Sequence, residues 1–355
     1  MKIGFDAKRL LFNSTGLGNY SRRWVEALIP HKSIELELYA PRDGEFMSLP
    51  VKFPDNTNSR FPAALWRVYG MGKAAEANGC DCFHGLSNEI PFDKPKIPMV
   101  CTIHDVIFKE FPHFYGVVDR QIYEWKTRNA CNRAAAIIVT SQTTKEQLLR
   151  FYSVQESRIH VIYQSIEPRF ALTAWHADLQ KPYLLYYSSF NPRKNQIKLI
   201  QSFEKIAKQV DFDLVIAGQG RGLQEIQQEV HRLKLVDRIK IIVSPSNDEL
   251  LNLLSKSSGF IYPSLQEGFG IPLVEAAHLG VPMAVSDIPI FRELSGNVAA
   301  AYFDPNKLEE MATAMITLFK VSQDQSYSKD RYREIIDKTE SKHMVEAALR
   351  VYHSV

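Results

Sequence analysis

The sequence predicts an α/β protein of two domains, each built on a doubly wound parallel sheet. Short apolar runs alternate with longer segments of helical period, which is the pattern of parallel βαβ units. This pattern starts again after about residue 165. A chain of 355 residues is also longer than the ~250 to 300 residues at which one hydrophobic core stops growing, so two cores are expected.

The first domain is expected over residues 1–165 and the second over 183–339. Strand-like runs of the first domain are KIGF, IELELYA, CDCFHG, PMVCTIH and AAIIVT, with a helix near 18–29. Those of the second are YLLYYSS, DLVIAG, IKIIVS, GFIYPS and VPMAVS, followed by helical segments such as NQIKLIQSFEKIAKQV. Residues 166–182 lack a clear period and indicate a linker, and a helix over about 340–355 is expected to pack back on the first domain.

Composition narrows the class of protein. With 45% hydrophobic and 23% charged residues, the chain is typical of a folded soluble protein. Its 43 basic and 40 acidic residues lack the excess of a nucleic-acid-binding protein, so no nucleic-acid partner is expected. Cys80, Cys82, Cys101 and Cys131 have no metal-ligand spacing and predict no disulfide scaffold. Without a signal peptide or an apolar run near ~18 residues, a cytoplasmic protein is expected, with peripheral contact at the inner face of the membrane left open.

In the first domain, Gly16 and Gly18 follow the first strand in STGLGNYSRRW. Glycines there let the backbone approach a phosphate or sugar closely. A dinucleotide fingerprint fails, because the third glycine position is Ser21. A tight turn without a ligand is the alternative.

Polar residues follow two other strands of this domain. His104 and Asp105 come directly after PMVCTI, where ligands of parallel sheets bind, so they are candidates for catalysis or ligand binding. The alternative is that they only cap the loop. His84, after CDCF, is as well explained by a structural role as by acceptor contact.

In the second domain, Arg193 and Lys194 follow the strand YLLYYSS. Two cations at a strand end suit a diphosphate, since charge-assisted contacts to phosphate are strong. A solvated basic turn is the alternative. Gly218 opens the loop GQGRG after DLVIAG, where a nucleotide base is expected, although an ordinary turn has the same composition.

The stretch QEGFGIPLVE holds two glutamates around a turn. Pro272 suits the first turn of a helix, so the amides of Gly268, Phe269, Gly270 and Ile271 precede a helix N-terminus that attracts an anion. Glu267 and Glu275 are expected to accept hydrogen bonds from sugar hydroxyls, one on a hexose and one on a ribose. The alternative for Glu275, expected in the first turn, is compensation of the helix dipole.

Two further motifs have structural interpretations. Asp211 and Asp213 form a D-x-D at the amino end of DLVIAG, away from the ligand edge, so a metal site is not expected there. Thr143 and Glu146 are interpreted as a helix capping box.

Taken together, the motifs resemble the retaining glycosyltransferases of family 4, whose GT-B fold has two facing Rossmann-like domains. The resemblance runs along the chain through GLGNYSRRW, CDCFHGLSNEIP, TIHDVIFKEFP, NPRKNQ, AGQGRG, QEGFGIPLVEAAHLGVPMAVSDIP and AAAYFDP. It implies transfer of a hexose from a nucleotide-sugar with retained anomeric configuration, and no metal or other cofactor.

The resemblance also implies roles for single residues. Lys194, helped by Arg193, neutralises the departing diphosphate, and Glu275 holds the ribose. Glu267 and the amides after it contact the hexose, and His104 meets the sugar from the other domain. Many relatives have a further arginine directly after the strand, which YYSSFNPRK lacks, so the phosphate contacts here are expected to differ.

GLGNY, IHD and PRKN are most similar to presumed mannosyltransferases of surface polysaccharide synthesis, which favours GDP-mannose as donor and a glycan or lipid-linked acceptor. A UDP-sugar is the alternative donor. An NAD-dependent oxidoreductase and a non-catalytic sugar-nucleotide binding protein are the alternative classes.

Residues 59–75 mix cations with apolar residues, as an interfacial membrane helix does. An ordinary amphipathic helix packed on the sheet is the alternative. The residues concerned are Arg60, Phe61, Leu65, Trp66, Arg67, Tyr69 and Lys73.

Overall fold

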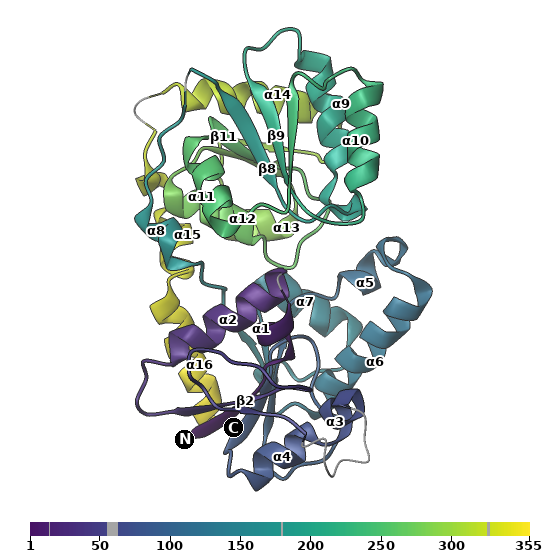
Figure 1. Ribbon diagram of the computed structural model, residues 1–355, viewed down its shortest axis with the longest axis vertical. Coiled ribbons are helices and arrows are strands. Elements are labelled where there is room, and N and C mark those ends of the chain that lie inside the picture. Colours follow the sequence, from purple (N-terminus) through teal and green to yellow (C-terminus); the bar gives the residue numbers. More distant parts are fainter. Residues whose placement is uncertain (14, 55–62, 179, 325–326) are drawn as a thin grey trace. The chain divides into compact units, whose positions relative to one another are not determined.

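The computed structural model describes residues 1–13, 15–54, 63–178, 180–324 and 327–355 (Figure 1). The chain divides into two compact units. The first comprises Met1–Ser165 together with Glu340–Val355, and the second comprises Ile166–Thr339.

The first unit is built on a parallel sheet of seven strands in the order β3-β2-β1-β4-β5-β6-β7. The strands are β1 Lys2–Asp6, β2 Glu35–Tyr39, β3 Val51–Lys52, β4 Cys82–Gly85, β5 Met99–Ile103, β6 Ala136–Val139 and β7 Ile159–Val161. Every residue of β4, β5 and β6 is buried, as expected for central strands covered on both faces.

Helices cover the two faces of this sheet. They are α1 Lys8–Phe12, α2 Gly16–Leu28, α3 Ala63–Tyr69, α4 Met71–Ala77, α5 Ile107–Glu110, α6 Val117–Arg133, α7 Gln142–Phe151 and α16 Ser341–His353, with 3-10 turns η1 Pro112–Phe114 and η2 Glu156–Arg158. The C-terminal α16 therefore belongs to the N-terminal sheet.

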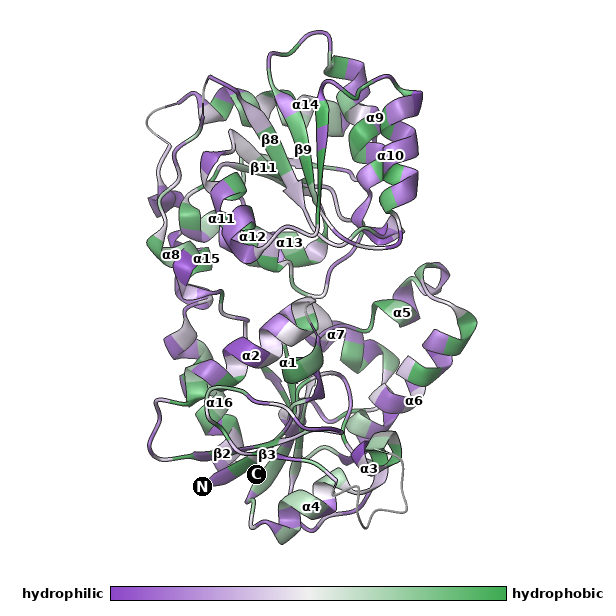
Figure 2. Cartoon of the chain, in the orientation of Figure 1, coloured by the Kyte–Doolittle hydropathy of each residue, from purple (hydrophilic) through white to green (hydrophobic). Residues whose placement is uncertain are grey.

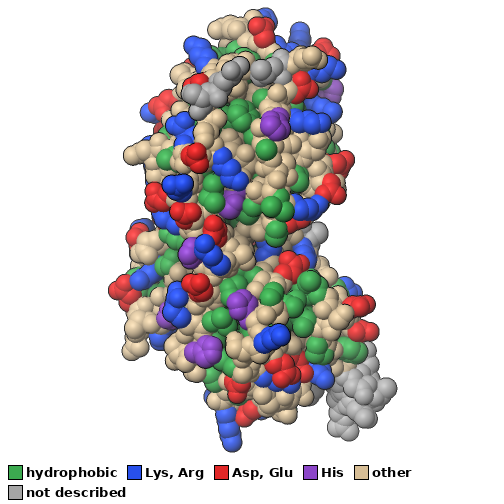
Figure 3. Space-filling view, turned by 90° about the vertical axis from the view of Figure 1, so that its left-hand side faces the viewer, with side chains coloured by type: hydrophobic (Ala, Val, Ile, Leu, Met, Phe, Trp, Pro, Cys, Tyr) green, Lys and Arg blue, Asp and Glu red, His purple; other side chains and the backbone are tan. Residues whose placement is uncertain are grey.

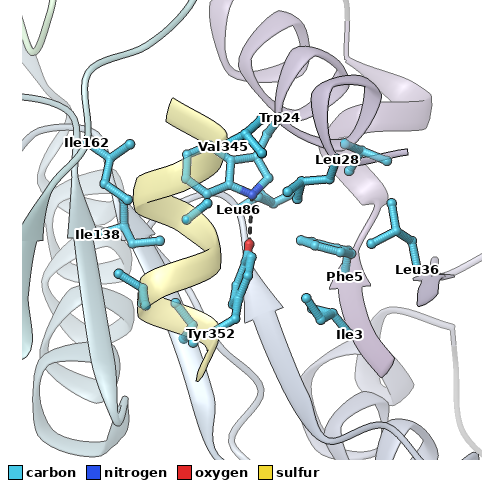
Figure 4. Close-up of a cluster of buried hydrophobic side chains, with 14 of the residues drawn as sticks. Ile3, Phe5, Trp24, Leu28, Leu36, Leu86, Ile138, Ile162, Val345 and Tyr352 are labelled. Carbon is cyan, nitrogen blue, oxygen red and sulfur yellow. Dashed lines mark hydrogen bonds between the residues drawn. The ribbon is translucent and has the colours of Figure 1, made fainter. Parts of the chain in front are cut away.

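A buried cluster holds α16 in place (Figure 4). The indole Nε1 of Trp24 on α2 donates to the hydroxyl of Tyr352 on α16 at 2.8 Å. The ring of His84 contacts the same hydroxyl at 2.7 Å through Nδ1 and Thr102 Oγ1 at 2.9 Å through Nε2. Burial lowers the pKa of His84 to about 3, so the ring is neutral. Of the two alternatives for His84, the structural one is confirmed.

The second unit is built on a parallel sheet of six strands in the order β10-β9-β8-β11-β12-β13. The strands are β8 Tyr183–Tyr187, β9 Asp213–Gly218, β10 Ile239–Val243, β11 Gly259–Tyr262, β12 Met283–Ser286 and β13 Ala301–Phe303. The helices are α8 Pro168–Leu172, α9 Gln196–Ile206, α10 Leu223–Arg232, α11 Asn247–Lys256, α12 Ile271–Leu279, α13 Pro289–Ser295, α14 Leu308–Ser322 and α15 Arg333–Lys338, with 3-10 turns η3 Pro192–Lys194 and η4 Lys329–Tyr332. In Figure 2, β9 is mostly hydrophobic while α10 mixes hydrophilic and hydrophobic residues, as expected for a helix with one face on a sheet.

The segment 166–182 runs along the second unit. It contains α8, and after it the backbone N–H groups of His176 and Asp178 donate to Ser255 O and Lys256 O at 2.8 and 2.9 Å. Trp175 Nε1 donates to Ser257 O at 2.7 Å. The stretch expected as a linker is thus hydrogen-bonded to the end of α11 and the residue after it.

The ten strand-like runs of the sequence are all confirmed as strands, while β3, β7 and β13 were not predicted. The four cysteines are free, and all four are buried. On the face shown in Figure 3, cations and carboxylates are interspersed, with no continuous basic stripe among the described residues visible there. In the described part of the chain, no helix combines the length and apolarity needed to cross a bilayer.

The structure bears on the two interpretations of residues 59–75. The described part is two short helices, α3 and α4, separated at Gly70, and Arg60 and Phe61 lie outside the described residues. Arg67 is only 7% exposed, which favours the interpretation of an ordinary helix packed on the sheet for this residue. Met71 of α4 packs in the core, as in the alternative of an ordinary amphipathic helix.

Candidate functional site

Two loops meet at the switch point of the second sheet, where β8 lies between β9 and β11. Ligands of open α/β sheets bind at this point, at the carboxyl ends of the strands. Leu265 N donates to Arg193 O at 2.9 Å, which joins the loops after β11 and β8. Asn195 has the left-handed φ of 63° that asparagine tolerates, and its Nδ2 donates to Pro263 O at 3.0 Å and Pro305 O at 2.7 Å. These bonds fix the backbone that carries the two cations.

A buried carboxylate, Glu267, contacts polar side chains from both of these loops. Its Oε1 accepts hydrogen bonds from Lys194 Nζ, from Tyr262 OH at 2.8 Å and from Ser264 Oγ at 2.7 Å. Its Oε2 lies 3.0 Å from Arg193 Nη1. Lys194 and Glu267 are only 7% and 6% exposed. The alternative of a solvated basic turn therefore fails for Lys194.

The cations determine the charge state of this cluster. Burial by itself raises the pKa of Glu267, but the charges of Lys194 and Arg193 hold the pKa at about 2. Glu267 is therefore ionised at neutral pH. Both cations pair with this one carboxylate, and lysine and arginine are the side chains that contact anionic ligands such as phosphates.

The helix α12 begins beside this cluster. Gly270 precedes it with φ 105°, and a Cβ there would lie 2.9 Å from the ring of Phe291, so glycine is required for two reasons. Glu275 is the fifth helical residue, so its prediction in the first turn is wrong, and dipole compensation explains it poorly. It is buried, and its Oε2 accepts a hydrogen bond from Tyr187 OH of β8 at 2.7 Å.

The loop after β9 packs on the loop after β8. Gly218 has φ 153°, and a Cβ there would lie 1.8 Å from Ser188 O. Phe190 N donates to Gln219 O at 2.7 Å across the same contact. Close packing of the two backbones thus explains why residue 218 is a glycine, and no ligand contact is needed to account for it.

In the first unit, His104 is held at the end of β5. Its Nε2 donates to Leu86 O at 2.9 Å, and its backbone N–H donates to Asn88 Oδ1 at 2.8 Å. Burial lowers the pKa of His104, so the ring is neutral at neutral pH. Because Leu86 O can only accept, Nε2 carries the proton and Nδ1 has the lone pair. Asp105 Oδ1 accepts from Ile107 N at 3.1 Å and so caps the start of α5, as the alternative for this residue proposed.

The glycines Gly16 and Gly18 lie at the start of α2. A Cβ on Gly18 would lie 1.9 Å from Asn13 O, so the turn between α1 and α2 requires glycine there. Among the described residues, no heavy atom apart from its chain neighbours and the backbone of α2 lies within 4 Å of a Cβ built on Gly16. Only Gly18 is explained by packing.

A buried ion network lies at the switch point of the first sheet, between β1 and β4. Arg67 Nη2 contacts Asp6 Oδ2 and Glu89 Oε1, both at 2.5 Å, and Lys126 Nζ lies 2.6 Å from Glu89 Oε2. Burial alone raises the pKa of Glu89, but the charges and hydrogen bonds of Arg67 and Lys126 together outweigh it and hold the pKa at about 2. Beside this network, Glu89, Lys126, His104 and Asp105 line a cleft of about 170 Å³.

Comparison with known proteins identifies the family. Residues 14–170 match the family described as Glycosyltransferase Family 4, and residues 173–339 match Glycosyl transferases group 1. The chain is a glycosyltransferase of these two families.

Individual relatives cover nearly the whole glycosyltransferase. It is 29% identical over 332 residues to the O-antigen chain mannosyltransferase RfbU of Salmonella typhimurium, across 86% of this chain and 88% of RfbU. It is 24% identical over 371 residues to O-antigen chain mannosyltransferase B of Escherichia coli, across 94% and 93%. The crystal structure of Anabaena Alr3699/HepE with UDP-glucose matches with a TM-score of 0.78 over 100% of both chains at 16% identity, which establishes the GT-B fold.

The predicted residues of the glycosyltransferase fall into two groups. Arg193, Lys194 and Glu267 come together directly, and the turn of residues 268–271 leads into α12 beside them. His104 and Asp105 belong to the other unit.

Several residues at the two switch points were not predicted. Tyr262 is the last residue of β11, Ser264 is the second residue after it, and Glu89 lies four residues after β4. A search of strand ends for hydroxyls and carboxylates would have found them. Arg67 and Lys126 lie within helices and carry no such signal.

The D-x-D lies where the sequence placed it. Asp213 is the first residue of β9 and pairs with Arg238 Nε at 2.7 Å, and Asp211 is exposed. Within the described ranges, no three His, Cys, Asp or Glu side chains are grouped to hold a metal ion.

Proposed function

We propose that this glycosyltransferase moves mannose from GDP-mannose to a glycan or lipid-linked acceptor of cell-surface polysaccharide, with the anomeric configuration retained and without a metal. The observation that carries the proposal is the cluster of Arg193, Lys194 and Glu267 beside the start of α12. Sugar transfer builds negative charge on a departing diphosphate, and preorganised cations and amides stabilise such charge.

The diphosphate is proposed to share the two cations with Glu267. Arg193 and Lys194 bring two positive charges, and both contact Glu267. Tyr262 and Ser264 also donate to Glu267 Oε1, so this carboxylate keeps hydrogen bonds when the cations turn to phosphate. Glu267 is then oriented to accept from a hydroxyl of the hexose.

Glu275 is proposed to hold the ribose of the donor. A carboxylate only accepts hydrogen bonds, and the two hydroxyls of a ribose supply donors. Tyr187 fixes the orientation of Glu275 from the adjacent strand. This role fits a buried carboxylate in the second turn better than dipole compensation does.

His104 of the first unit is proposed to contact the transferred sugar. The neutral ring uses Nε2–H on Leu86 O, so Nδ1 is the atom that accepts from a sugar hydroxyl. Asp105 is proposed as a positioning residue, because its carboxylate caps α5 and its backbone carbonyl accepts from Asn88 Nδ2 at 2.9 Å.

Relatives support mannose as the sugar. Besides the two O-antigen mannosyltransferases, the GDP-mannose:cellobiosyl-diphosphopolyprenol alpha-mannosyltransferase of Xanthomonas campestris is 27% identical over 248 residues. The alignment covers 67% of this chain and 62% of that enzyme. A UDP-sugar is the second candidate donor, since the similar HepE structures contain UDP or UDP-glucose.

The test is a donor panel. Titration calorimetry with GDP-mannose, UDP-glucose, UDP-galactose and ADP-glucose is expected to give the tightest binding for GDP-mannose. Proton NMR of the product is expected to show the donor's α configuration, and turnover is expected to persist in EDTA. If a UDP-sugar binds more tightly than GDP-mannose, the donor assignment changes to that sugar. A product of inverted configuration refutes retention. Metal independence is refuted if turnover is lost in EDTA and restored by added Mn²⁺.

A further inference from the structure

The imidazole of His104 is oriented by one hydrogen bond and by a second ring that lies against it. Nε2 donates to Leu86 O at 2.9 Å, which fixes one edge of the imidazole but leaves its tilt about that bond open. The ring of Tyr20 on α2 lies perpendicular to the imidazole, with the two centroids 4.5 Å apart. Edge-to-face ring pairs of this kind favour one relative orientation. Tyr20 is therefore placed to set the tilt of the imidazole, and with it the direction of the Nδ1 lone pair.

A chain of buried hydrogen bonds holds the hydroxyl of Tyr20. This hydroxyl contacts Thr102 Oγ1 on β5 at 3.1 Å, and the same Oγ1 lies 2.9 Å from His84 Nε2. His84 Nδ1 lies 2.7 Å from the hydroxyl of Tyr352 on α16, which accepts from Trp24 Nε1 (Figure 4). None of these five residues is more than 3% exposed. The chain thus runs from α16 through β4 and β5 to α2.

The direction of most of these hydrogen bonds follows from the groups themselves. The Tyr352 oxygen accepts from the indole, which can only donate, and in the described part of the chain the phenol proton has no acceptor other than His84 Nδ1. A neutral imidazole that accepts at Nδ1 carries its proton on Nε2, so Nε2 donates to Thr102 Oγ1. Loss of the Tyr352 hydroxyl therefore releases the tautomer of His84, and with it the bond to Thr102.

We propose that Tyr20 is a positioning residue for His104. Tyr20 is in turn kept in place by the hydrogen-bond chain that begins at Tyr352. The proposal rests on the proposed function, in which Nδ1 of His104 accepts from a hydroxyl of the transferred sugar, and it adds that α16 controls the orientation of that atom. The effect on the reaction is large for a small movement, because a misplacement of about 1 Å costs up to about 10²-fold in rate.

Thr102 lies in the middle of the chain and offers a matched pair of variants. Thr102→Val removes the hydroxyl and keeps the β-branched shape that suits a strand, whereas Thr102→Ser keeps the hydroxyl and removes a methyl group. In turnover of GDP-mannose, Thr102→Val is expected to lower kcat about tenfold with KM within about twofold of wild type. Thr102→Ser is expected to retain a kcat near that of wild type. If Thr102 only filled space in the core, loss of the methyl group would be the more harmful change.

Tyr352→Phe tests the chain from its far end, because it removes one hydroxyl on α16 and leaves His104 and the ring against it unchanged. Long-range proton–nitrogen NMR spectra of the histidine rings in the full chain are the readout, and His104→Gln identifies the His104 signals. These signals are expected to shift in both Tyr352→Phe and Thr102→Val. Tyr39→Phe is the control, since it removes a buried hydroxyl that binds Glu37 elsewhere in the same unit, and it is expected to leave the signals and kcat unchanged.

The proposal is overturned if the His104 signals of Tyr352→Phe match those of wild type, or if Thr102→Ser lowers kcat as much as Thr102→Val. An equal loss of turnover in Tyr39→Phe would also overturn it, because the cause would then be lost stability. All measurements are made well below the melting temperature of the least stable variant. If Thr102→Val does not fold, Tyr352→Phe decides the question.

Calorimetry of the wild type with GDP-mannose and UDP-glucose keeps the proposed function separate. A wild type that binds neither nucleotide-sugar refutes the donor function, while the histidine spectra still decide whether the chain orients the His104 ring. A wild type that turns over its donor, with Thr102→Val and Tyr352→Phe at the same kcat, refutes only the positioning role.

Discussion

The two units share a topology but use their switch points differently. In the second unit, the strand ends carry two cations and one carboxylate, Arg193, Lys194 and Glu267. In the first unit, Arg67 and Lys126 are matched by Asp6 and Glu89. Both places bury a carboxylate whose pKa is held at about 2, Glu267 and Glu89 respectively.

The difference teaches that the arrangement of the charged contacts, more than the fold, distinguishes the sites. In the first network, each charge that is removed from water is compensated by an opposite charge of the protein. In the second unit both cations contact the single carboxylate Glu267, and the proposed donor brings its own anionic groups to them. The predictions below test whether the first network is structural and the second functional.

The largest effect is expected from breaking the balanced network. Arg67→Met leaves Asp6 without its partner and Glu89 with only Lys126, so the free energy of unfolding should fall by about 3 to 5 kcal/mol. Urea denaturation of the full chain measures it. Arg128→Met removes the exposed pair with Glu124 on the same unit and should cost far less stability, because solvent screens this pair. Equal losses in the two variants would contradict a structural role specific to Arg67.

The next effect concerns catalysis in the second unit. Lys194→Ala should lower kcat about 10² to 10³-fold, because one preorganised charge on the leaving group is lost. Lys198→Ala, four residues later on α9, removes a lysine that contacts Asn306 and should leave kcat unchanged. Steady-state kinetics with GDP-mannose measures both variants. Turnover near the wild-type rate in Lys194→Ala would show that the charge of Lys194 does not contribute to catalysis.

Acid should weaken the first network. The pKa of Glu89 is lowered from its ordinary value near 4.5 to about 2. A depressed folded-state pKa stabilises the fold above pH 4.5, and this stability is lost as the pH falls toward 2. The loss is on the order of 3 kcal/mol. Glu89→Gln should therefore be less stable than wild type at pH 7, and the gap should close between pH 4.5 and 2. A gap independent of pH in denaturation curves would show that Glu89 is not ionised in the folded chain.

Donor affinity gives a smaller effect. Glu275→Gln keeps the shape and the contact with Tyr187 but weakens acceptance from ribose hydroxyls, so the Kd for GDP-mannose should rise about tenfold. Glu225→Gln, on the exposed first turn of α10, is the control. If calorimetry finds equal affinity for wild type and Glu275→Gln, then this carboxylate has only a structural role.

The sequence predicted the long strands and failed on the shortest. β3, β7 and β13 have two or three residues and lie at sheet edges, too short for an apolar run to stand out. The cluster around Lys194 follows from strand ends, because parallel strands bring those residues to one edge. Arg67 could not be placed, since its burial depends on two carboxylates from distant segments, Asp6 and Glu89.

The smallest effect compares one serine in each unit. The predicted capping box of Thr143 and Glu146 is wrong, because Ser141 is the N-cap of α7 and accepts from Thr144 N. In the second unit, Ser246 caps α11 in a full box with Glu249. Replacing either serine by alanine should cost about 1 kcal/mol of stability. Ser246→Ala is expected to cost less, since its cap is exposed and water can replace the hydroxyl, whereas Ser141 is fully buried. Denaturation curves in which Ser246→Ala loses more would show that the reciprocal bond from Glu249 outweighs burial.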